Sequence, residues 1–445
     1  MPDSRGSSQV TPEERPPVER PTPRSRLPRF WVMLLLVLAG ALGVRVVYVA
    51  TVTNHDRHFY DAFWYEFEAV AIGNGHGVIN AVFNQPDHPN ADHPPLTSVV
   101  LVPIAKLTDG SQLAMKVTMA VLGTVGVLAI ALIAREIAGD RVALIAAVVA
   151  AIYPNLWIND GLIMAETLSA LLVAVAVLLA YKLLRRPAWG IAIALGVVCG
   201  LAMLTRAELG LLIPFVALPA CVVAAARSTG RRLALAGAVV LVAALTVSPW
   251  VIRNLTTFEK PVYLSSGDGL VLAGANCKST YGGPALGYWD LSCAIARRAR
   301  TGDVSVSASR QRHLAIDYMR AHPGRLALSA AARVGRVWSV YAPVQTAELA
   351  RGEGRPLGLS LVGVGMLYVL FPIAIVGAFV LRRRRVPVFP LLGTFAIVTL
   401  TGVAFYGWTR FRVPAEVAIV VLASVALDGW LFERRERTSS VGSTI

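Results

Sequence analysis

The sequence predicts an all-α polytopic membrane protein, and three observations lead to this fold class. Of the 445 residues, 55% are hydrophobic and only 16% are charged, with a mean hydropathy of +0.59. This balance is too apolar for an ordinary soluble protein. Apolar runs near the ~20 residues needed to cross a bilayer recur along the chain. The net charge of +15 lies largely in short loops between these runs, which indicates membrane topology rather than nucleic-acid binding.

The chain divides into about ten predicted spans. They cover residues 30–52, 113–134, 141–158, 162–181, 189–205, 208–226, 232–252, 357–381, 387–407 and 413–432. The run 94–108 begins with Pro94-Pro95 and is too short to span comfortably. We therefore expect an interfacial or re-entrant helix there.

Both chain ends are polar. Residues 1–29 are rich in Pro, Arg, Ser and Glu, and a segment with so little apolar surface cannot offset its ordering entropy, so we expect a disordered tail. Residues 433–445 form a second tail. The first apolar run, 30–52, is too long for the apolar core of a signal peptide and lacks a convincing cleavage site, so it is interpreted as a span.

The basic loops set the predicted orientation. With the N-terminal tail in the cytoplasm, every alternate short loop is basic, as the positive-inside rule requires. Ten spans put both termini in the cytoplasm, whereas an additional span at 94–108 would move the run Arg382–Arg385 outside. The expected inner basic residues are Arg135, Arg141, Lys182, Arg185, Arg186, Arg227, Arg231, Arg232, Arg382–Arg385, Arg434, Arg435 and Arg437.

This topology predicts a domain organisation with two outer segments. An N-terminal membrane module covers 30–252 and includes a first outer loop at 53–112. A second outer segment, 253–356, begins with Gly/Ser-rich turns and is helical in pattern around 305–340, so we expect a small, mostly helical cap. C-terminal spans cover 357–432. The unusual polar residues gather on the outer side, and ionisable groups beside spans are costly unless they face a cavity.

The first outer loop combines acidic and aromatic side chains in the run YDAFWYEFEAVAIGNGHG, followed by DHPPL. Asp61 lies among Phe59, Tyr60, Phe63, Trp64 and Tyr65. Acidic and aromatic side chains together just outside a membrane indicate a reaction site, and a carboxylate is a suitable general base. An interfacial aromatic belt explains the aromatics alone equally well, so Asp61 carries the functional interpretation.

These motifs resemble the first outer loop of the GT-C membrane glycosyltransferases of glycosyltransferase family 39, the relatives of protein O-mannosyltransferases and of the lipid A aminoarabinose transferase. The resemblance continues, in the family's order, over most of residues 30–432. The segments that carry it are REIAGDRVALIAA, AIYPNLWINDGLIMAETL, GLAMLTRAELGLLIPF, SPWVIRNLTTFEKPVYLSS and TRFRVPAE.

The resemblance implies an activity and a substrate class. Members of this family take a sugar from a polyprenyl-phosphate carrier and pass it, with inversion, to an acceptor outside the cytoplasmic membrane. An aspartate of the first outer loop serves as base, and Asp61 is at the matching place. Glu66 and Glu68 depart from the polar residues usual in the family, although Tyr65 and Glu66 remain candidate substrate contacts.

Arginines are the candidate ligands for the carrier phosphate, because guanidinium stays charged and binds phosphate through paired hydrogen bonds. Arg206 follows the outer end of a span, and a salt bridge with Glu208 is the competing interpretation. Arg410 and Arg412 are two residues apart beside the last span, and only one of them needs to point inward. Arg253 is better explained as an interfacial anchor.

Three further side chains are candidate substrate contacts. Asp160 and Glu166 match acidic positions of the family, where they would bind a metal, orient the acceptor or pair with an arginine. Two carboxylates without a neighbouring His are a weak metal signal, so no metal ligand is assigned and a divalent ion stays open as a cofactor. His93 precedes Pro94-Pro95 and is a candidate sugar or phosphate contact, although a lone loop His is more often structural.

The four cysteines fall into two groups. Cys277 and Cys293 lie in the segment predicted to be outside, where oxidation is permitted. The intervening sequence is rich in Gly and contains a Pro, so the chain can fold back and the two residues are predicted to form a disulfide. Cys199 and Cys221 lie within apolar spans and are expected to stay reduced.

The predicted partners are a polyprenyl-phosphate sugar, the bilayer and an extracytoplasmic acceptor that is a protein, a lipid or a cell-wall glycan, with no nucleic acid. The alternative function is a transporter or flippase of a lipid-linked envelope precursor. Transporters often show internal repeats with broken helices at the midplane. The sequence shows no such repeat, which favours the enzyme.

Overall fold

The computed structural model describes residues 27–54, 61–80, 85–225, 228–296 and 302–430. Most of the predicted tail residues, 1–26 and 433–445, lie outside the described residues, as do Phe59, Tyr60 and the last two residues of the predicted span 413–432. The first helix already begins at Leu27, so the expected tail boundary at residue 29 was slightly too late. Pro28 does not prevent this early start, because proline is tolerated in the first turn of a helix.

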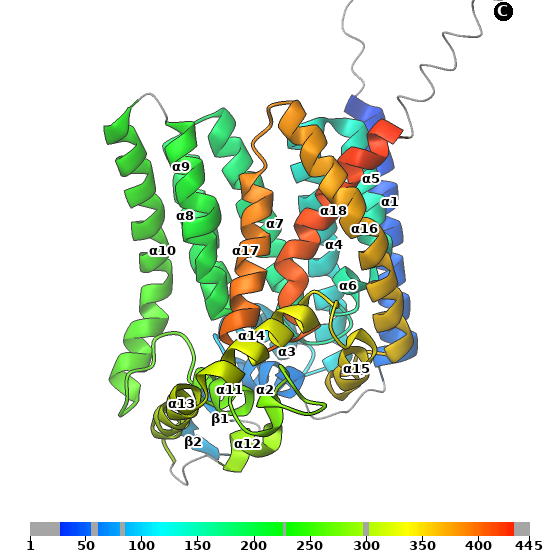
Figure 1. Ribbon diagram of the computed structural model, residues 1–445. Helices are drawn as coiled ribbons and strands as arrows, with labels where there is room; N and C mark the ends of the chain where they lie inside the picture. The colour runs from blue at the N-terminus through cyan, green and yellow to red at the C-terminus, as the bar shows by residue number, and fades with distance from the viewer. Residues whose placement is uncertain (1–26, 55–60, 81–84, 226–227, 297–301, 431–445) are drawn as a thin grey trace, which may run out of the picture.

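A bundle of roughly parallel and antiparallel helices forms the body of the molecule (Figure 1). Its members are α1 (Leu27–Tyr48), α4 (Gln112–Ala138), α5 (Asp140–Ile152), α7 (Ala165–Arg185), α8 (Trp189–Thr205), α9 (Leu218–Ala224), α10 (Thr229–Thr257), α16 (Leu357–Arg383), α17 (Phe389–Ala404) and α18 (Val413–Asp428). Short π- and 3₁₀-helical turns adjoin them at Val49–Thr53, Ala207–Leu211 and Ile213–Ala217.

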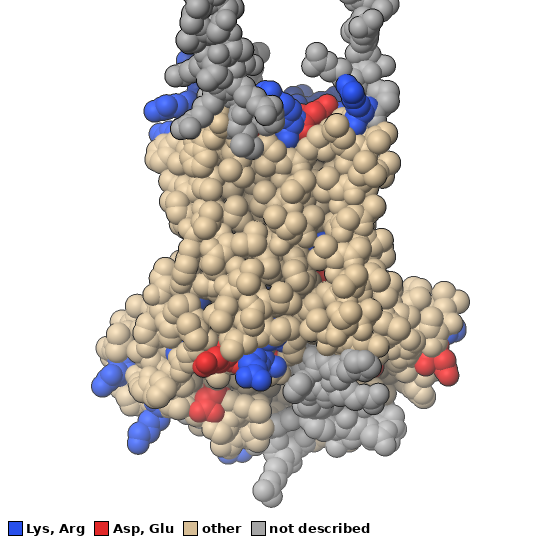
Figure 2. Space-filling model, turned by 90° about the vertical axis from the view of Figure 1, so that its right-hand side faces the viewer, with Lys and Arg blue, Asp and Glu red and all other residues tan. Residues whose placement is uncertain are grey.

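Six helical stretches in the described part of the chain are long and apolar enough to cross a membrane. They are Arg29–Thr53, Gln112–Ala138, Ala165–Arg185, Ala207–Ala224, Thr229–Thr257 and Leu357–Arg383. Shorter apolar helices include Trp189–Thr205 and Phe389–Ala404. Figure 2 shows a broad band of uncharged side chains with charged ones at both ends. The chain is therefore a multi-pass membrane protein.

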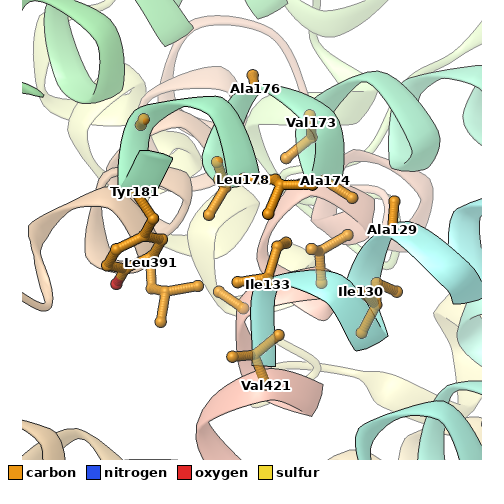
Figure 3. Close-up of a cluster of buried hydrophobic side chains, with 14 of the residues drawn as sticks. Ala129, Ile130, Ile133, Val173, Ala174, Ala176, Leu178, Tyr181, Leu391 and Val421 are labelled. Atoms are coloured by element: carbon orange, nitrogen blue, oxygen red, sulfur yellow. The ribbon is translucent and has the colours of Figure 1, made fainter. Parts of the chain in front are cut away.

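Small residues let the bundle helices approach closely, as is usual in membrane proteins. A Cβ added at Gly196 or Gly200 of α8 would lie within 3 Å of Val239 or Thr246 of α10, and one at Gly377 of α16 would collide with the Leu422 carbonyl of α18. Helix α18 is almost entirely buried. Figure 3 shows its Val421 near Ile133 of α4, in a cluster that also includes Ile130 of α4 and Val173 and Ala174 of α7.

Contacts between loops gather several basic residues at one end of the bundle. Arg135 pairs with Asp140, Arg185 pairs with Glu136, and Arg231 donates to the Pro187 carbonyl. Helix α1 begins and α18 ends at this same end (Figure 1).

A cap of short elements covers the opposite end (Figure 1). Its first part is α2 (Asp61–Gly73), α3 (Leu96–Leu107) and two short antiparallel strands, β1 (Ile79–Asn80) and β2 (Gln85–Pro89). Its second part is α11 (Gly267–Ala275), α12 (Leu291–Ala296), α13 (Val304–Ala321), α14 (Pro323–Val337) and α15 (Pro343–Leu349). The segment 253–356 is mostly helical, as expected, whereas the strands were not predicted.

Two fully buried arginines of α14 hold the cap together, and one of them also reaches the bundle. Arg333 donates to the carbonyls of Ala275 and Val403, and Arg336 donates to those of Leu286 and Pro284. A buried charge is tolerated when its donors find acceptors, and side-chain oxygens of Asn276, Thr346 and Gln345 accept further hydrogen bonds from the two groups. Arg336 therefore fixes the loop around residue 285 to α14, and Arg333 joins α14 to the last turn of α17.

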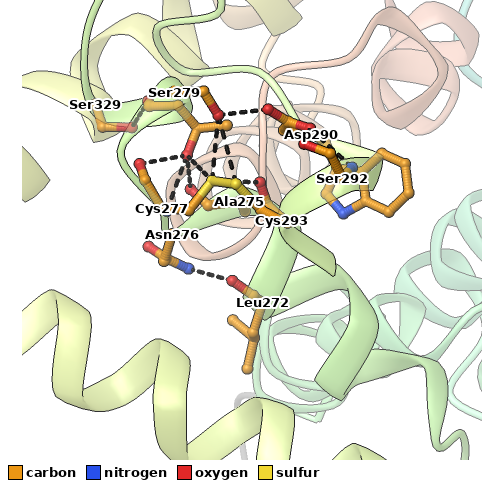
Figure 4. The surroundings of a disulfide bond; sticks show 12 residues. Leu272, Ala275, Asn276, Cys277, Ser279, Asp290, Ser292, Cys293 and Ser329 are labelled. Carbon is orange, nitrogen blue, oxygen red and sulfur yellow. Dashed lines mark hydrogen bonds between the residues drawn. A yellow bond between two sulfur atoms is a disulfide. The ribbon is translucent and has the colours of Figure 1, made fainter. Parts of the chain in front are cut away.

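A disulfide closes the other side of that loop. Cys277 and Cys293 are bonded, with their Cα atoms 6.4 Å apart. Beside the bond, the Ser279 hydroxyl donates to the Asp290 carboxylate (Figure 4). Cys199 and Cys221 are buried and free.

Candidate active site

Two adjoining chambers lie where the cap meets the bundle. The bundle-side chamber, about 220 Å³, takes part of its wall from the ends of bundle helices, at Glu166 of α7 and Thr205 of α8. The cap-side chamber, about 490 Å³, is bounded by α2, α11–α13, the turn after α15 and the α17–α18 connection. The residues common to both walls are Asp61, Trp64, Asp92, Leu270, Trp289, Tyr406 and Arg410.

The Asp61–Arg410 pair lies on the boundary between the chambers. Asp61 is the first residue of α2, and Arg410 belongs to the 3₁₀ turn Thr409–Arg412 that precedes α18. Arg410 Nη1 lies 2.7 Å from Asp61 Oδ2 and 2.8 Å from Glu353 Oε1, while Nη2 donates to the Tyr406 hydroxyl at 2.8 Å. One guanidinium thus connects residues 349 positions apart in sequence.

A second arginine extends this network into the bundle-side chamber. Arg206 directly follows α8, and its guanidinium pairs with Glu166 and Glu208. Glu166 lies at the start of α7 and is also 3.8 Å from Arg410 Nε. The Phe411 ring lies beside both guanidinium groups, at 5.0 Å from Arg206 and 5.8 Å from Arg410. Glu166 is therefore shared by the two arginines.

The surroundings of Asp61 control its ionisation. Burial tends to raise the pKa of its carboxyl, but the charges of Arg410, His93 and Arg206 and the hydrogen bond from Arg410 outweigh burial and lower the pKa to about 2. Its side chain keeps 32% of its surface exposed to the chamber. Asp61 is therefore an ionised and accessible carboxylate at neutral pH.

The pKa values of two neighbouring groups, Glu353 and Tyr65, are raised rather than lowered. Burial raises the pKa of Glu353 to about 6, although Arg410 acts against it. Burial also raises the pKa of the Tyr65 phenol well above its usual value, with the charges of Asp61 and Glu166 adding to the effect. Tyr65 is thus a neutral hydroxyl beside an ionised aspartate, able to donate a hydrogen bond.

Acidic groups outnumber basic ones around the bundle-side chamber. Its acidic lining residues are Asp61, Asp92, Glu166, Glu208 and Asp268, and its basic ones are His93, Arg206 and Arg410. Both arginines are already paired with carboxylates. An anionic ligand must therefore compete with these carboxylates for the guanidinium groups.

The structure separates the residues predicted from sequence into two sets. Six of them line the bundle-side chamber together with Asp61: Tyr65, His93, Glu166, Arg206, Glu208 and Arg410. The ring of His93 lies 5.0 Å from that of Tyr65.

The other predicted residues line neither chamber. Glu66 accepts a hydrogen bond from Gln112, and Arg253 donates to the carbonyls of Asn90 and Val78. Asp160 is buried and pairs with Arg45, which is the arginine-pairing alternative considered for it. Arg412 is buried against Glu416 and the Val337 carbonyl, so Arg410 is the arginine of that pair that points inward.

Sequence reasoning missed Glu353, Tyr406 and Trp289. Glu353 and Trp289 lie in the segment 253–356, which carries no recognisable motif, and Tyr406 lies just before the recognised TRFRVPAE segment. Their roles depend on the position of Arg410, which only the folded chain reveals.

One group in the described part of the chain has the geometry of a metal site: Cys277, Asp290 and Cys293. Metal ions bind cysteine as thiolate, and these two sulfurs are joined in the disulfide. The donor set therefore does not fit a resident metal, and none is assigned.

Residues 92–252 match the family model for dolichyl-phosphate-mannose-protein mannosyltransferases. Over this segment the chain is similar to that family. The matched segment contains Glu166, Arg206 and Glu208, whereas Asp61, Glu353 and Arg410 lie outside it. The match confirms the resemblance to GT-C membrane glycosyltransferases. No curated protein matches the chain.

Solved structures with a similar fold include the oligosaccharyltransferase AglB from Archaeoglobus fulgidus in complex with an inhibitory peptide and a dolichol-phosphate. The TM-score is 0.57 and the identity 14%, over 95% of this chain and 52% of AglB. The apo form of the Archaeoglobus fulgidus enzyme gives 0.54 and 14%, over 94% and 52%. The chain thus spans about half the length of this oligosaccharyltransferase. This chain and AglB share the arrangement of their helices.

ArnT from Cupriavidus metallidurans also matches. In its apo state the TM-score is 0.40 and the identity 16%, over 91% of this chain and 78% of ArnT. The same protein bound to undecaprenyl phosphate gives 0.39 and 16%, over the same shares.

Proposed function

We propose that the protein transfers a sugar from a polyprenyl-phosphate carrier to a hydroxyl of an extracytoplasmic acceptor, with inversion and with Asp61 as general base. The observation that carries the proposal is the Asp61–Arg410 pair on the boundary between two chambers. A base and a cation side by side are what this reaction needs, because a proton is removed while phosphate charge develops. The glycosyltransferase family of residues 92–252 supports the same chemistry.

The proposed step is a single displacement. The acceptor oxygen attacks the anomeric carbon as the bond between that carbon and the phosphate oxygen breaks. The phosphate leaves with the electron pair, as polyprenyl phosphate, and the acceptor proton passes to Asp61. Polyprenyl phosphate is already a good leaving group, so no general acid is required. Arg410 and Arg206 are proposed to stabilise the phosphate charge.

Pairing with Arg410 makes Asp61 a weak base before the donor binds, because its pKa is held at about 2. A phosphate in the bundle-side chamber would attract Arg410 and draw it from Asp61. The pKa of Asp61 would then rise toward that of a buried carboxyl, since burial alone raises it. Donor binding would thus strengthen the base at the moment when an acceptor proton must be accepted.

The membrane topology is part of the proposal. We propose that ten helices span the membrane. Both termini and the basic loops then lie on the cytoplasmic side, and the cap with both chambers lies on the extracytoplasmic side. The shared location of Arg135, Arg185 and Arg231 at the end opposite the cap supports this orientation under the positive-inside rule. A transporter would need its polar site near mid-membrane, whereas this network lies where the bundle meets the cap.

The test uses the purified full-length protein in nanodiscs with a panel of polyprenyl-phosphate sugars. Release of polyprenyl phosphate from one of them, dependent on Arg410, is the expected result. Sugars missing from envelope glycans or glycoproteins of a deletion strain, measured by mass spectrometry, identify which donor and acceptor to use. Turnover of no lipid-linked sugar, together with an unchanged envelope in the deletion strain, would rule the proposal out.

A further inference from the structure

The cap-side chamber differs from its neighbour in position. Its wall takes no residue from the long apolar helices of the bundle, whereas the bundle-side chamber borders α7 and α8. A lipid-linked donor stays anchored in the bilayer, so its phosphate reaches the chamber that borders the bundle. The cap-side chamber meets it at Asp61 and Arg410, which is where a second reactant must present its hydroxyl.

Four aromatic rings form a continuous wall of the cap-side chamber. Tyr288 stacks on Trp408 with 4.7 Å between ring centroids, Tyr406 lies 5.9 Å from Trp408, and Trp289 lies 6.3 Å from Tyr406. A hydrogen bond of 2.8 Å from the Gly407 amide to the Gly287 carbonyl joins the two segments that carry these rings.

The backbone of this wall requires glycine. Gly287 has φ +73°, and a Cβ at Gly287 or Gly407 would lie within 3 Å of α14. Only glycine lets the two loop segments pass so close to that helix. The rings are thus held by a rigid scaffold of Gly287, Gly407 and the buried arginines of α14.

The charges of this chamber are less suited to an anion than those of its neighbour. Its charged lining residues are three acids, Asp61, Asp92 and Glu353, and one base, Arg410, which already pairs with Asp61 and Glu353. An anionic glycan would therefore find one cation here, whereas the bundle-side chamber also offers Arg206 and His93. The carboxylates and the amide of Gln311 are instead suited to the hydroxyl groups of a neutral ligand.

Secondary structure argues against a bound peptide. Extended peptides commonly add as a strand to an open sheet edge, and neither β1 nor β2 contributes a residue to this wall. Helices and turns line the described chamber. Aromatic faces with a few polar groups are suited to the apolar face and the hydroxyl rim of a sugar ring.

From these observations we infer that the cap-side chamber is the acceptor site and that it binds a neutral carbohydrate. The inference rests on the proposed function and specifies its acceptor class. The attacking group is then a sugar hydroxyl presented to Asp61 across the aromatic wall, and the product is a glycosidic bond between two sugars.

The test blocks the chamber without entering the protein core. Ile295 of α12 lines the chamber but is 56% exposed, so Ile295→Trp narrows the chamber while the fold is kept. Leu314→Trp is the matched control, because Leu314 of α13 is 38% exposed and does not line the chamber. Full-length protein in nanodiscs is titrated with neutral hexose and pentose di- and trisaccharides, with their phosphorylated forms, and with a Ser/Thr-rich peptide.

Saturable binding of a neutral oligosaccharide is expected. Ile295→Trp should weaken it by about 10-fold or more, since one misplaced methylene group in a pocket has an effect of that size. Leu314→Trp should leave it unchanged, and undecaprenyl phosphate should bind all three proteins equally. Peptide or phosphorylated-glycan binding that Ile295→Trp abolishes overturns the carbohydrate assignment. If no acceptor probe binds, or if Ile295→Trp leaves glycan binding unchanged, the cap-side chamber is not the acceptor site.

These results separate the two proposals. If the protein cleaves a polyprenyl-phosphate sugar but Ile295→Trp has no effect on glycan binding or transfer, the acceptor site fails and the proposed function stands. If no lipid-linked sugar is bound or turned over by the wild-type protein, the proposed function fails as well.

Discussion

Removing the Arg410 guanidinium tests the network on which the site depends. In Arg410→Met a side chain of similar length replaces the guanidinium, and Asp61, Glu353 and Glu166 lose a partner at 2.7, 2.8 and 3.8 Å. Breaking a fully buried ion pair typically costs about 3–5 kcal/mol, because it leaves an uncompensated charge. The structure indicates a smaller loss here.

Each carboxylate has a way to limit that loss. Asp61 keeps 32% of its side chain exposed and can be hydrated, and Glu166 keeps Arg206. Glu353 is the most affected, but its pKa is already about 6, so near neutral pH it can take up a proton at modest cost. We expect a destabilisation of about 1–3 kcal/mol, below the range for a fully buried pair. Loss of one cation for the developing charge should lower transfer by about 10²–10³-fold.

The assay is thermal unfolding of the purified variants together with sugar transfer. The double variant Arg410→Met/Glu353→Gln should regain most of the lost stability, because the unpaired carboxylate is gone, while transfer stays low. Equal stability of Arg410→Met and the wild-type protein, or strictly additive effects of the two substitutions, would refute the ion network as described.

Three further predictions concern topology, the disulfide and pH. A membrane-impermeant thiol reagent should label cysteines introduced at 265–345 in intact cells and at 382–385 only after lysis; labelling of both from one side would contradict the ten-span orientation. Cys277→Ser/Cys293→Ser should lower stability by about 3 kcal/mol, as expected for closing a loop of this length, and peptide mapping should find both residues resistant to alkylation until reductant is added. The Glu353 pKa is raised from 4.5 to about 6, so between these pH values the folded protein keeps this carboxyl protonated while the unfolded chain has lost the proton. The free energy of unfolding should therefore fall by about 2 kcal/mol as the pH rises from 4.5 through 6. Glu353→Gln should abolish that decline when unfolding is measured across this pH range. An unchanged decline in the variant would show that Glu353 is not its cause.

The helices were largely predictable because a bilayer requires long apolar runs, and α8 begins and ends where its run does, at residues 189–205. Strands β1 and β2 were not predictable, because strands of two and five residues depend on their pairing rather than on a local sequence pattern. Only six helical stretches in the described chain reach spanning length by themselves. Helices such as α17 and α18 are shorter, and α18 is kept in place by burial on every side.

The candidate site was predictable in part for the same reason. Asp61, Arg206 and Arg410 stand out because a charge beside an apolar run has a high cost unless it is used. Glu353 and the aromatic wall at Tyr288 and Trp408 do not stand out, since Glu353 lies in a short 3₁₀ turn and the rings lie in loops without a recognisable motif. Arg412 carries the same sequence signal as Arg410, and only packing against Glu416 reveals its different place.

Sugar transfer by Asp61→Asn tests the central claim most directly. The amide keeps the shape of the carboxylate and its contact with Arg410 but cannot accept the acceptor proton, so transfer should fall by about 10²–10⁴-fold. Donor binding should be kept. Glu68→Gln is the matched control, because Glu68 lies on the same helix, accepts a hydrogen bond from Ser98 and lines neither chamber. It should transfer sugar at the wild-type rate. Transfer by purified Asp61→Asn close to that of the Glu68→Gln control would contradict Asp61 as the base.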